Sequence, residues 1–128
     1  MPVYRPAASS ILRSFLASGK RHLLLTGGRG SGKTTLLRDL IRGLSDGAEG
    51  VSPHRVAVVD ERGEIAVMFQ GIPQMALGSH TDVLDACPKA LGIPILLRSA
   101  NPQVIAVDEI TVRELSLIHI SEPTRHLR

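Results

Sequence analysis

The sequence predicts an α/β fold built on a parallel sheet, and three observations support this prediction. Short apolar runs at 22–26, 55–59 and 104–109 are typical of buried parallel strands. Segments with helical spacing separate these runs. A glycine-rich turn follows the first run, and acidic residues end or follow the other two. A chain that alternates strand and helix in this order forms a parallel sheet with right-handed crossovers.

The first half of the chain predicts helix, strand and helix. Residues 7–18 place their apolar side chains on one stripe, and Gly19 can end that helix. Residues 22–26 predict a short strand that is stopped by glycine. Residues 34–44 return to helical spacing, although Gly43 weakens the end of the helix.

The middle of the chain alternates loops with short strands. A polar, glycine-containing loop at 45–54 precedes the buried strand at 55–59. Residues 64–69 predict a short extra strand, and residues 70–80 are rich in turn signals.

Residues 81–100 are predicted to be helical in part. Pro88 suits a first helical turn, whereas Pro94 does not suit a helix interior, so we expect a break or kink near Gly92-Ile93-Pro94. Asp82 and Asp85 lie three residues apart and would share a helical face, with plain solvent exposure as the simpler interpretation.

Composition and charge limit the classes of function. With 128 residues, of which 43% are hydrophobic, the chain predicts one domain with an aliphatic core. Aromatic residues make up 2%, which disfavours a stacking platform for single-stranded nucleic acid. The net charge of +3 is too small to indicate binding to DNA or to a membrane surface. Cys87 has no partner cysteine, and neither a membrane span nor a signal peptide is evident, which favours a cytoplasmic protein.

The turn after the first apolar run matches the phosphate-loop pattern G-x-x-x-x-G-K-[ST] at every fixed position. Glycines let backbone amides converge on phosphate oxygens, and the following helix directs its positive end to the same place. Lys33 is expected to act as a catalytic group on the β- and γ-phosphates of ATP, and Thr34 to offer its hydroxyl to Mg²⁺. Arg38 and Arg42 add positive charge where a polyphosphate would need it. The expected cofactor-binding residues are Gly27, Gly28, Arg29, Gly30, Ser31, Gly32, Lys33, Thr34 and Thr35.

Two acidic segments are candidate partners of this loop. Asp108 ends the third predicted strand, where its carboxylate can join the Mg²⁺ shell, and Glu109 is the candidate base for the attacking water. Asp60 and Glu61 follow the second predicted strand and are weaker candidates for the metal, since ligands gather at the carboxyl ends of parallel strands. The alternatives are a strand that ends in solvated acids and a solvated turn in which Arg62 pairs locally.

Longer motifs carry a more specific resemblance. The segments GKTTLLRDLIR, VVDERGEIA, TDVLDACPKA and ILLRSANPQVIAVDEI resemble the stage III sporulation protein AA family of spore-forming Firmicutes, over roughly residues 10–110. That family is similar to the secretion-type traffic ATPases. The resemblance implies a RecA-like P-loop NTPase core that hydrolyses Mg-ATP. Residues 60–64 match the acidic box of those ATPases, and Asp108 with Glu109 matches their second acidic motif.

The resemblance also implies an assembly and a place of action. It implies a ring, expected to be a hexamer, in the cytoplasm of the mother cell and peripheral to a membrane channel complex around the forespore. Its expected partners are ATP, further copies of the chain and components of that channel. A neighbouring subunit is expected to supply an arginine, because phosphoryl transfer depends mostly on charge stabilisation. A nucleic-acid motor stays open, although no aromatic groove or strong basic patch favours it.

The sequence departs from the family at both ends. Residues 1–20 are interpreted as a lead helix left from a larger N-terminal region, residues 21–110 as the ATPase core fragment, and residues 111–128 as a non-native tail. In RecA-like sheets the strand after the second acidic motif inserts between the two motif strands. Only 115–120 can replace it here, so we expect an incomplete core, with central and later strands missing, that is marginally stable and poorly active.

Two other functions stay open beside the ATPase. The first is a non-catalytic nucleotide-binding fragment. The second is a small-molecule P-loop kinase, for which the sequence offers no acceptor pocket or lid. The absence of an N-K-x-D motif disfavours a GTPase, and the absence of an L-S-G-G-Q-like segment disfavours a transporter ATPase.

Overall fold

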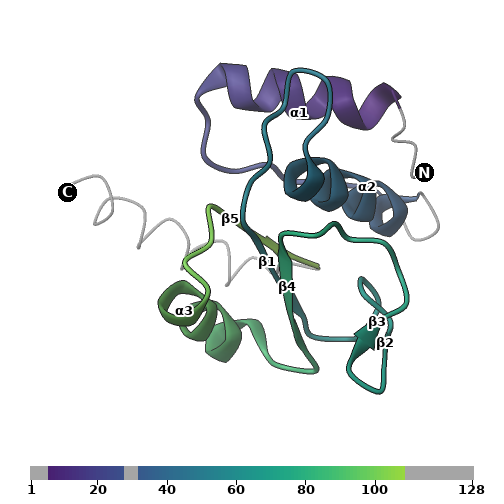
Figure 1. Cartoon of the computed structure of the whole chain (residues 1–128), viewed down its shortest axis with the longest axis vertical. Helices are drawn as coiled ribbons and strands as arrows, with labels where there is room; N and C mark the ends of the chain where they lie inside the picture. The colour runs from purple at the N-terminus through teal and green to yellow at the C-terminus, as the bar shows by residue number, and fades with distance from the viewer. Residues whose placement is uncertain (1–5, 28–31, 109–128) are drawn as a thin grey trace.

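The computed structural model of the chain describes residues 6–27 and 32–108 (Figure 1). Within these residues, a parallel sheet has the strand order β4-β1-β5, and a short antiparallel pair, β2-β3, lies beside it. Both faces of the parallel sheet carry helices (Figure 1). The elements are α1 (Pro6–Ser18), α2 (Lys33–Asp46), β1 (Val56–Asp60), β2 (Met68–Phe69), β3 (Ile72–Pro73), β4 (Thr81–Asp85), α3 (Lys89–Ser99) and β5 (Val104–Val107). The predicted α/β class with a parallel sheet is confirmed.

Strand β1 is the centre of the fold, and all five of its residues are buried. Successive side chains of a strand point to opposite faces, so β1 contributes to two cores. Val56 and Val58 pack with the buried residues of α1 and α2, while Ala57 and Val59 pack with Leu96 of α3. The layers are therefore α1 and α2, then the sheet, then α3. A strand covered on both faces reads as a continuous apolar run, which is why the sequence identified it.

The sheet register brings the carboxyl ends of its strands to one edge. Asp60 of β1 pairs with Asp85 of β4. On the other side of β1, Val59 pairs with Val107, the residue that precedes Asp108. Three acidic residues from distant parts of the sequence therefore lie next to one another along this edge.

Helix α2 is longer than its sequence predicts because Gly43 has a packing role. Gly43 is buried, and a Cβ atom built on it would lie 2.8 Å from Cδ1 of Leu12. The missing side chain lets α1 approach α2 closely, so that Leu12 enters the core beside Leu40 and Ile41. This tertiary contact offsets the weak helix propensity of glycine, and α2 continues to Asp46.

The strand predicted at 22–26 is wrong for the described part of the chain, where residues 22–26 have no strand assignment. Leu25 packs against the core of α1 and α2, but Leu23 and Leu24 are 45% and 55% exposed. A strand needs a neighbour for its backbone groups. In the described sheet β1 is the partner of both β4 and β5, and neither of these pairs with 22–26.

The prediction for residues 81–100 is wrong in two respects. Its first part is strand β4, so Asp82 and Asp85 lie on a strand and do not share a helical face. Helix α3 then runs without a break through Pro94, and Pro88 precedes its first turn as the N-cap residue. Pro94 is exposed, while Gly92 and Leu96 are buried against the sheet. This packing holds the helix across the missing backbone donor of the proline.

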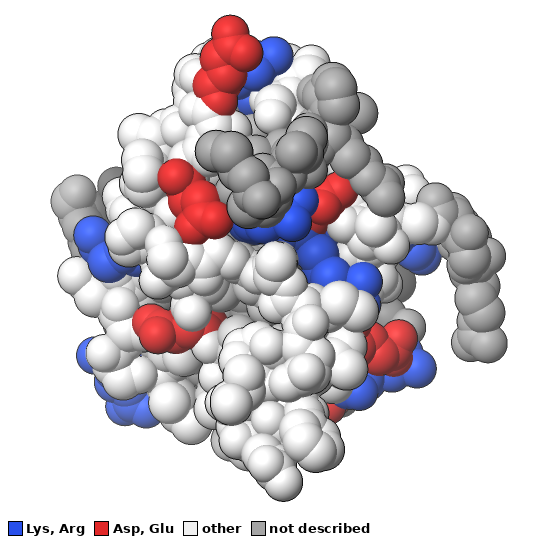
Figure 2. All heavy atoms as spheres, turned by 45° about the vertical axis from the view of Figure 1, so that its right-hand side comes forward, with Lys and Arg blue, Asp and Glu red and all other residues white. Residues whose placement is uncertain are grey.

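No helix in the described ranges is both long enough and apolar enough to span a bilayer. On the face shown in Figure 2, basic and acidic side chains lie interspersed. The uncharged lobe at the bottom of that view belongs to the β2–β3 hairpin, whose residues 65–77 contain no charged side chain.

Gly78 fixes the approach of the loop before β4 to the end of α2, and replacing it by alanine should destabilise the fold. Its φ is +95°, and an added Cβ would lie 2.4 Å from both Cβ and Oγ of the buried Ser45. We expect Gly78→Ala to lower the free energy of unfolding by about 2–4 kcal/mol, from backbone strain and steric overlap. Urea denaturation followed by circular dichroism measures this change.

The matched control is Gly71→Ala. Gly71 also has a positive φ, of +78°, but nothing lies within 4 Å of an added Cβ. We expect Gly71→Ala to lower the free energy of unfolding by about 1–2 kcal/mol, from backbone strain alone. Equal losses in the two variants would show that the contact with Ser45 does not limit the packing of this loop.

Candidate functional site

The N-terminus of α2 lies at the end of the phosphate-loop motif. Gly32 adopts the left-handed region, with φ 89° and ψ 13°, where a side chain would be strained. Its carbonyl oxygen accepts the first intrahelical hydrogen bond, from the amide of Leu36, at 2.9 Å. Helix α2 therefore starts directly at Lys33, and the backbone amides of its first turn point out of this end of the helix.

The side chain of Lys33 reaches back to the first glycine of the motif. Its ammonium group donates a hydrogen bond to the carbonyl oxygen of Gly27, so that the first and last parts of the motif are in contact. Thr34 and Thr35 are half-buried in the first turn of α2. Residues 28–31, with Gly28, Arg29, Gly30 and Ser31 as predicted ligands, lie outside the described residues.

Asp60 organises the turn that follows β1. Its side chain is completely buried, and its carboxylate accepts hydrogen bonds from the amide of Ala66 at 2.9 Å and from the amide of Ile65 at 3.2 Å. Ile65 and Ala66 are themselves fully buried in the core of α1 and α2. The predicted metal role of Asp60 stays a prediction. In this structure its carboxylate satisfies two buried backbone donors.

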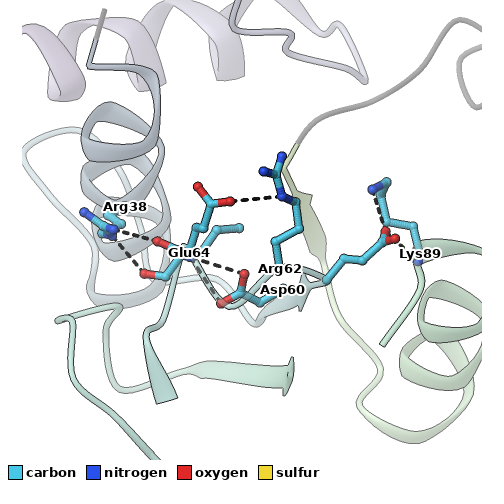
Figure 3. A network of polar contacts seen from close by, with 7 residues as sticks. Arg38, Asp60, Arg62, Glu64 and Lys89 are labelled. Carbon is cyan, nitrogen blue, oxygen red and sulfur yellow. Dashed lines mark hydrogen bonds and ion pairs between the residues drawn. The ribbon is translucent and has the colours of Figure 1, made fainter. Parts of the chain in front are cut away.

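Arg38 of α2 holds the same turn from the opposite side. Its Nε donates to the carbonyl oxygen of Ile65 at 2.8 Å, and its Nη2 donates to that of Glu64 at 2.6 Å (Figure 3). Arg38 thus forms its hydrogen bonds with residues 60–66, which we call the acidic loop. Arg42, one turn further along α2, has its Nη2 3.3 Å from the carboxylate of Asp39. Both arginines therefore have protein contacts in the structure, whereas the sequence suggested that they surround a polyphosphate.

Two ion pairs involve the acidic loop: one joins it to α3, and the other lies within the loop. Glu61 accepts a hydrogen bond from the ammonium group of Lys89, at the start of α3, at 2.7 Å. Arg62 and Glu64 form an ion pair at 3.0 Å within the loop (Figure 3), so the local pairing proposed for Arg62 is present. The hydrogen bond from the Lys89 side chain lowers the pKa of Glu61 below its ordinary value of 4.5, and the backbone amide of Lys89 adds to this effect.

The lowered pKa of Glu61 predicts a pH-dependent contribution to stability. Because the folded state favours the ionised carboxylate, the contribution is present above pH 4.5 and is lost as pH falls through the lower pKa of the folded chain. We expect Glu61→Gln to be slightly less stable than the wild type at about pH 6, and this difference to vanish toward about pH 2. Urea denaturation at a series of pH values measures this. A difference that persists at the lowest pH would contradict the assignment.

The second acidic motif lies only partly within the described residues. Asp108 is half-buried directly after β5, beside Asp60 at the carboxyl edge of the sheet. Glu109, the predicted base, lies outside the described ranges. Among the described residues, no three His, Cys, Asp or Glu side chains form a group that could hold a metal ion. Thr34 and Asp108 remain predicted ligands of Mg²⁺.

The structure gives two residues a contact with the acidic loop that the sequence alone had not suggested. Lys89 anchors Glu61, and Arg38 anchors the backbone of the acidic loop. A signal for Arg38 existed in the sequence: it lies at helical spacing with Thr34, Ile41 and the buried Ser45, on the inward side of α2. A basic residue at such a position needs a partner close to the core.

Fold and site together define a parallel α/β protein with a phosphate-loop motif at the start of a helix and an acidic loop tied to that helix. The model of the family described as "Sporulation stage III, protein AA" matches residues 4–121, and the chain belongs to this family. The matched range extends past Ile110, where the resemblance recognised in the sequence motifs ends.

A curated relative from the same family supports this assignment. The chain is 52% identical over 87 residues to "Stage III sporulation protein AA" of Bacillus subtilis (strain 168). The aligned part covers 68% of this chain and 28% of that relative. No solved structure matches the chain.

Proposed function

We propose that this chain is the nucleotide-binding part of a sporulation ATPase that binds and hydrolyses Mg-ATP. Membership of the stage III protein AA family supports a role in sporulation. The observation that carries the ATPase proposal is the phosphate-loop motif at 27–34, whose last glycine is left-handed and directly precedes the first turn of α2. This arrangement fits a phosphate chain, because glycine backbone and helix N-terminus present amide donors together.

The residues of the motif fit the predicted ligand in charge and position. The ammonium group of Lys33 rests on the carbonyl oxygen of Gly27, within the motif that would receive the phosphates. The half-buried Thr34 follows it on α2 and offers a hydroxyl group. Residues 27–35 would hold the phosphates, and Thr34 with Asp108 would hold Mg²⁺. The metal would neutralise negative charge on the phosphates.

Catalysis in this proposal depends on charges that converge on the γ-phosphate. Lys33 stabilises the negative charge that develops there, and Glu109 orients the attacking water and accepts its proton. The parallel sheet of β4, β1 and β5 is compatible with a RecA-like core. By analogy with secretion-type ATPases, the whole protein would form a ring in which a neighbouring subunit supplies an arginine. Such a ring would work in the cytoplasm, at a membrane channel complex.

Release of inorganic phosphate from ATP tests the proposal. The chain is incubated with ATP and Mg²⁺, with EDTA in a parallel sample, and compared with Glu109→Gln. Release that needs Mg²⁺, needs no added acceptor and falls in the variant supports the ATPase. Release only after an acceptor is added would support a kinase instead. Nucleotide binding without release would support a non-catalytic binding module.

A further inference from the structure

Arg38 joins the helix of the phosphate loop to the acidic loop through two backbone carbonyls. Nε and Nη2 of one guanidinium group reach the carbonyl oxygens of the neighbouring residues Ile65 and Glu64, at 2.8 and 2.6 Å (Figure 3). The planar guanidinium presents its donors in a fixed fork, so both hydrogen bonds form from one side-chain orientation. Lysine, with its compact ammonium group, cannot reproduce that geometry.

The acidic loop is also held from its other side, by Asp60 of β1. The carboxylate of Asp60 accepts hydrogen bonds from the amides of Ile65 and Ala66. Both residues are fully buried in the same core as Ile41 of α2. Arg38 and Asp60 thus form hydrogen bonds to the same short backbone segment, residues 64–66. A displacement of α2 relative to β1 must stretch one set of these hydrogen bonds or move the loop.

The other end of this connection is the phosphate-loop motif. Lys33 is the first residue of α2, and its ammonium group contacts the carbonyl oxygen of Gly27 in the structure. A phosphate group within the motif would compete with that carbonyl for the same ammonium group. Occupancy of the motif would therefore change the forces on the helix that carries Arg38.

We propose that Arg38 is a positioning residue that transmits nucleotide binding from the phosphate loop to the acidic loop. The inference rests on the proposed nucleotide site, and it adds a regulation of that site which runs through α2. Beyond the loop, the ion pair of Glu61 with Lys89 extends the connection to α3. The opposite face of the sheet therefore receives the same signal.

Amide hydrogen exchange tests the inference in the full chain. The probe is the β,γ-imido analogue of ATP with Mg²⁺, and its affinity is measured by calorimetry for each variant. In the wild type, we expect the analogue to slow exchange at the amides of Ile65 and Ala66 by about fivefold or more. In Arg38→Gln this slowing should be lost, while the affinity for the analogue changes by less than about threefold. Arg38→Lys should retain an intermediate part of the slowing.

The matched control is Arg55→Gln. Arg55 also donates from its Nε to a backbone carbonyl, that of Asn101 at 2.9 Å, but it precedes β1 at the opposite edge of the sheet. This variant should keep the wild-type response to the analogue, which separates coupling from a general loss of an arginine.

The possible outcomes separate the coupling role of Arg38 from the proposed nucleotide site. If the wild type binds the analogue and Arg38→Gln keeps the full slowing, the coupling role is overturned and the nucleotide site stands. If Arg55→Gln loses the slowing as fully as Arg38→Gln, the coupling role is also overturned. Failure of the wild type to bind the analogue overturns the proposed function, and this inference with it.

Discussion

Replacing Lys33 by alanine should weaken the binding of Mg-ATP by about 10- to 100-fold and lower phosphate release by at least about a hundredfold. Lys33 is the first residue of α2, and its ammonium group donates a hydrogen bond to the carbonyl oxygen of Gly27. Its removal takes away the charged donor that the proposal assigns to the β- and γ-phosphates. Calorimetric titration with the imido analogue of ATP measures the affinity, and a phosphate assay measures the turnover.

Lys20→Ala is the matched control for this change. Lys20 is exposed, precedes the motif and carries the same charge, so its removal alters the net charge of the chain equally. Binding to the control variant should stay within about twofold of the wild type, because exposed charges at a distance are screened by salt. Equal losses of affinity in both variants would show that Lys33 acts only through the net charge of the chain. An unchanged affinity in Lys33→Ala would refute the nucleotide site.

The second large effect is expected at Asp60, where alanine should lower the free energy of unfolding by about 2–5 kcal/mol. The substitution leaves the buried amides of Ile65 and Ala66 without their acceptor, and each unsatisfied donor is costly in a dry environment. Asp60→Asn keeps one acceptor oxygen and should lose about half as much. Urea denaturation with a circular dichroism readout gives the values.

Asp85→Ala is the control, because Asp85 is the register partner of Asp60 on β4 but is exposed. The free energy of unfolding of this variant should stay within about 0.5 kcal/mol of the wild-type value. The same set of variants separates two roles for Asp60. A loss of stability without added metal identifies the carboxylate as the acceptor that shapes the acidic loop. If Asp60→Ala keeps wild-type stability and loses only the Mg²⁺ dependence of nucleotide binding, the metal role predicted from the sequence is correct instead.

Local sequence patterns were enough to predict the elements that are self-contained. Residues 55–59 form a continuous apolar run, and the central strand β1 is buried on both faces. Residues 7–18 and 34–44 have apolar stripes, and they form α1 and α2. The phosphate-loop motif needs only a fixed order of residues, so the amino-acid sequence alone is enough to identify it.

Elements that depend on partners were harder to predict. Residues 22–26 are as apolar as β1, yet they have no strand assignment, since no strand of the described sheet pairs with them. Residues 81–85 have a weak apolar pattern and still form β4, because hydrogen bonds to the buried β1 hold them. Pro94 was expected to break or kink a helix, but no break occurs, because burial of Gly92 and Leu96 on the sheet keeps α3 continuous.

By itself, the sequence determined the α/β class, the family and the phosphate-loop motif, because each depends on residue types in a fixed local order. Only the tertiary structure showed that the carboxylate of Asp60 accepts hydrogen bonds from backbone amides of the acidic loop, and that Arg38 connects this loop to α2. It also showed that Lys89 from α3 lowers the pKa of Glu61. These contacts join residues that are far apart along the chain. Their geometry exists only once the sheet register and the helix packing are fixed, which no local pattern encodes.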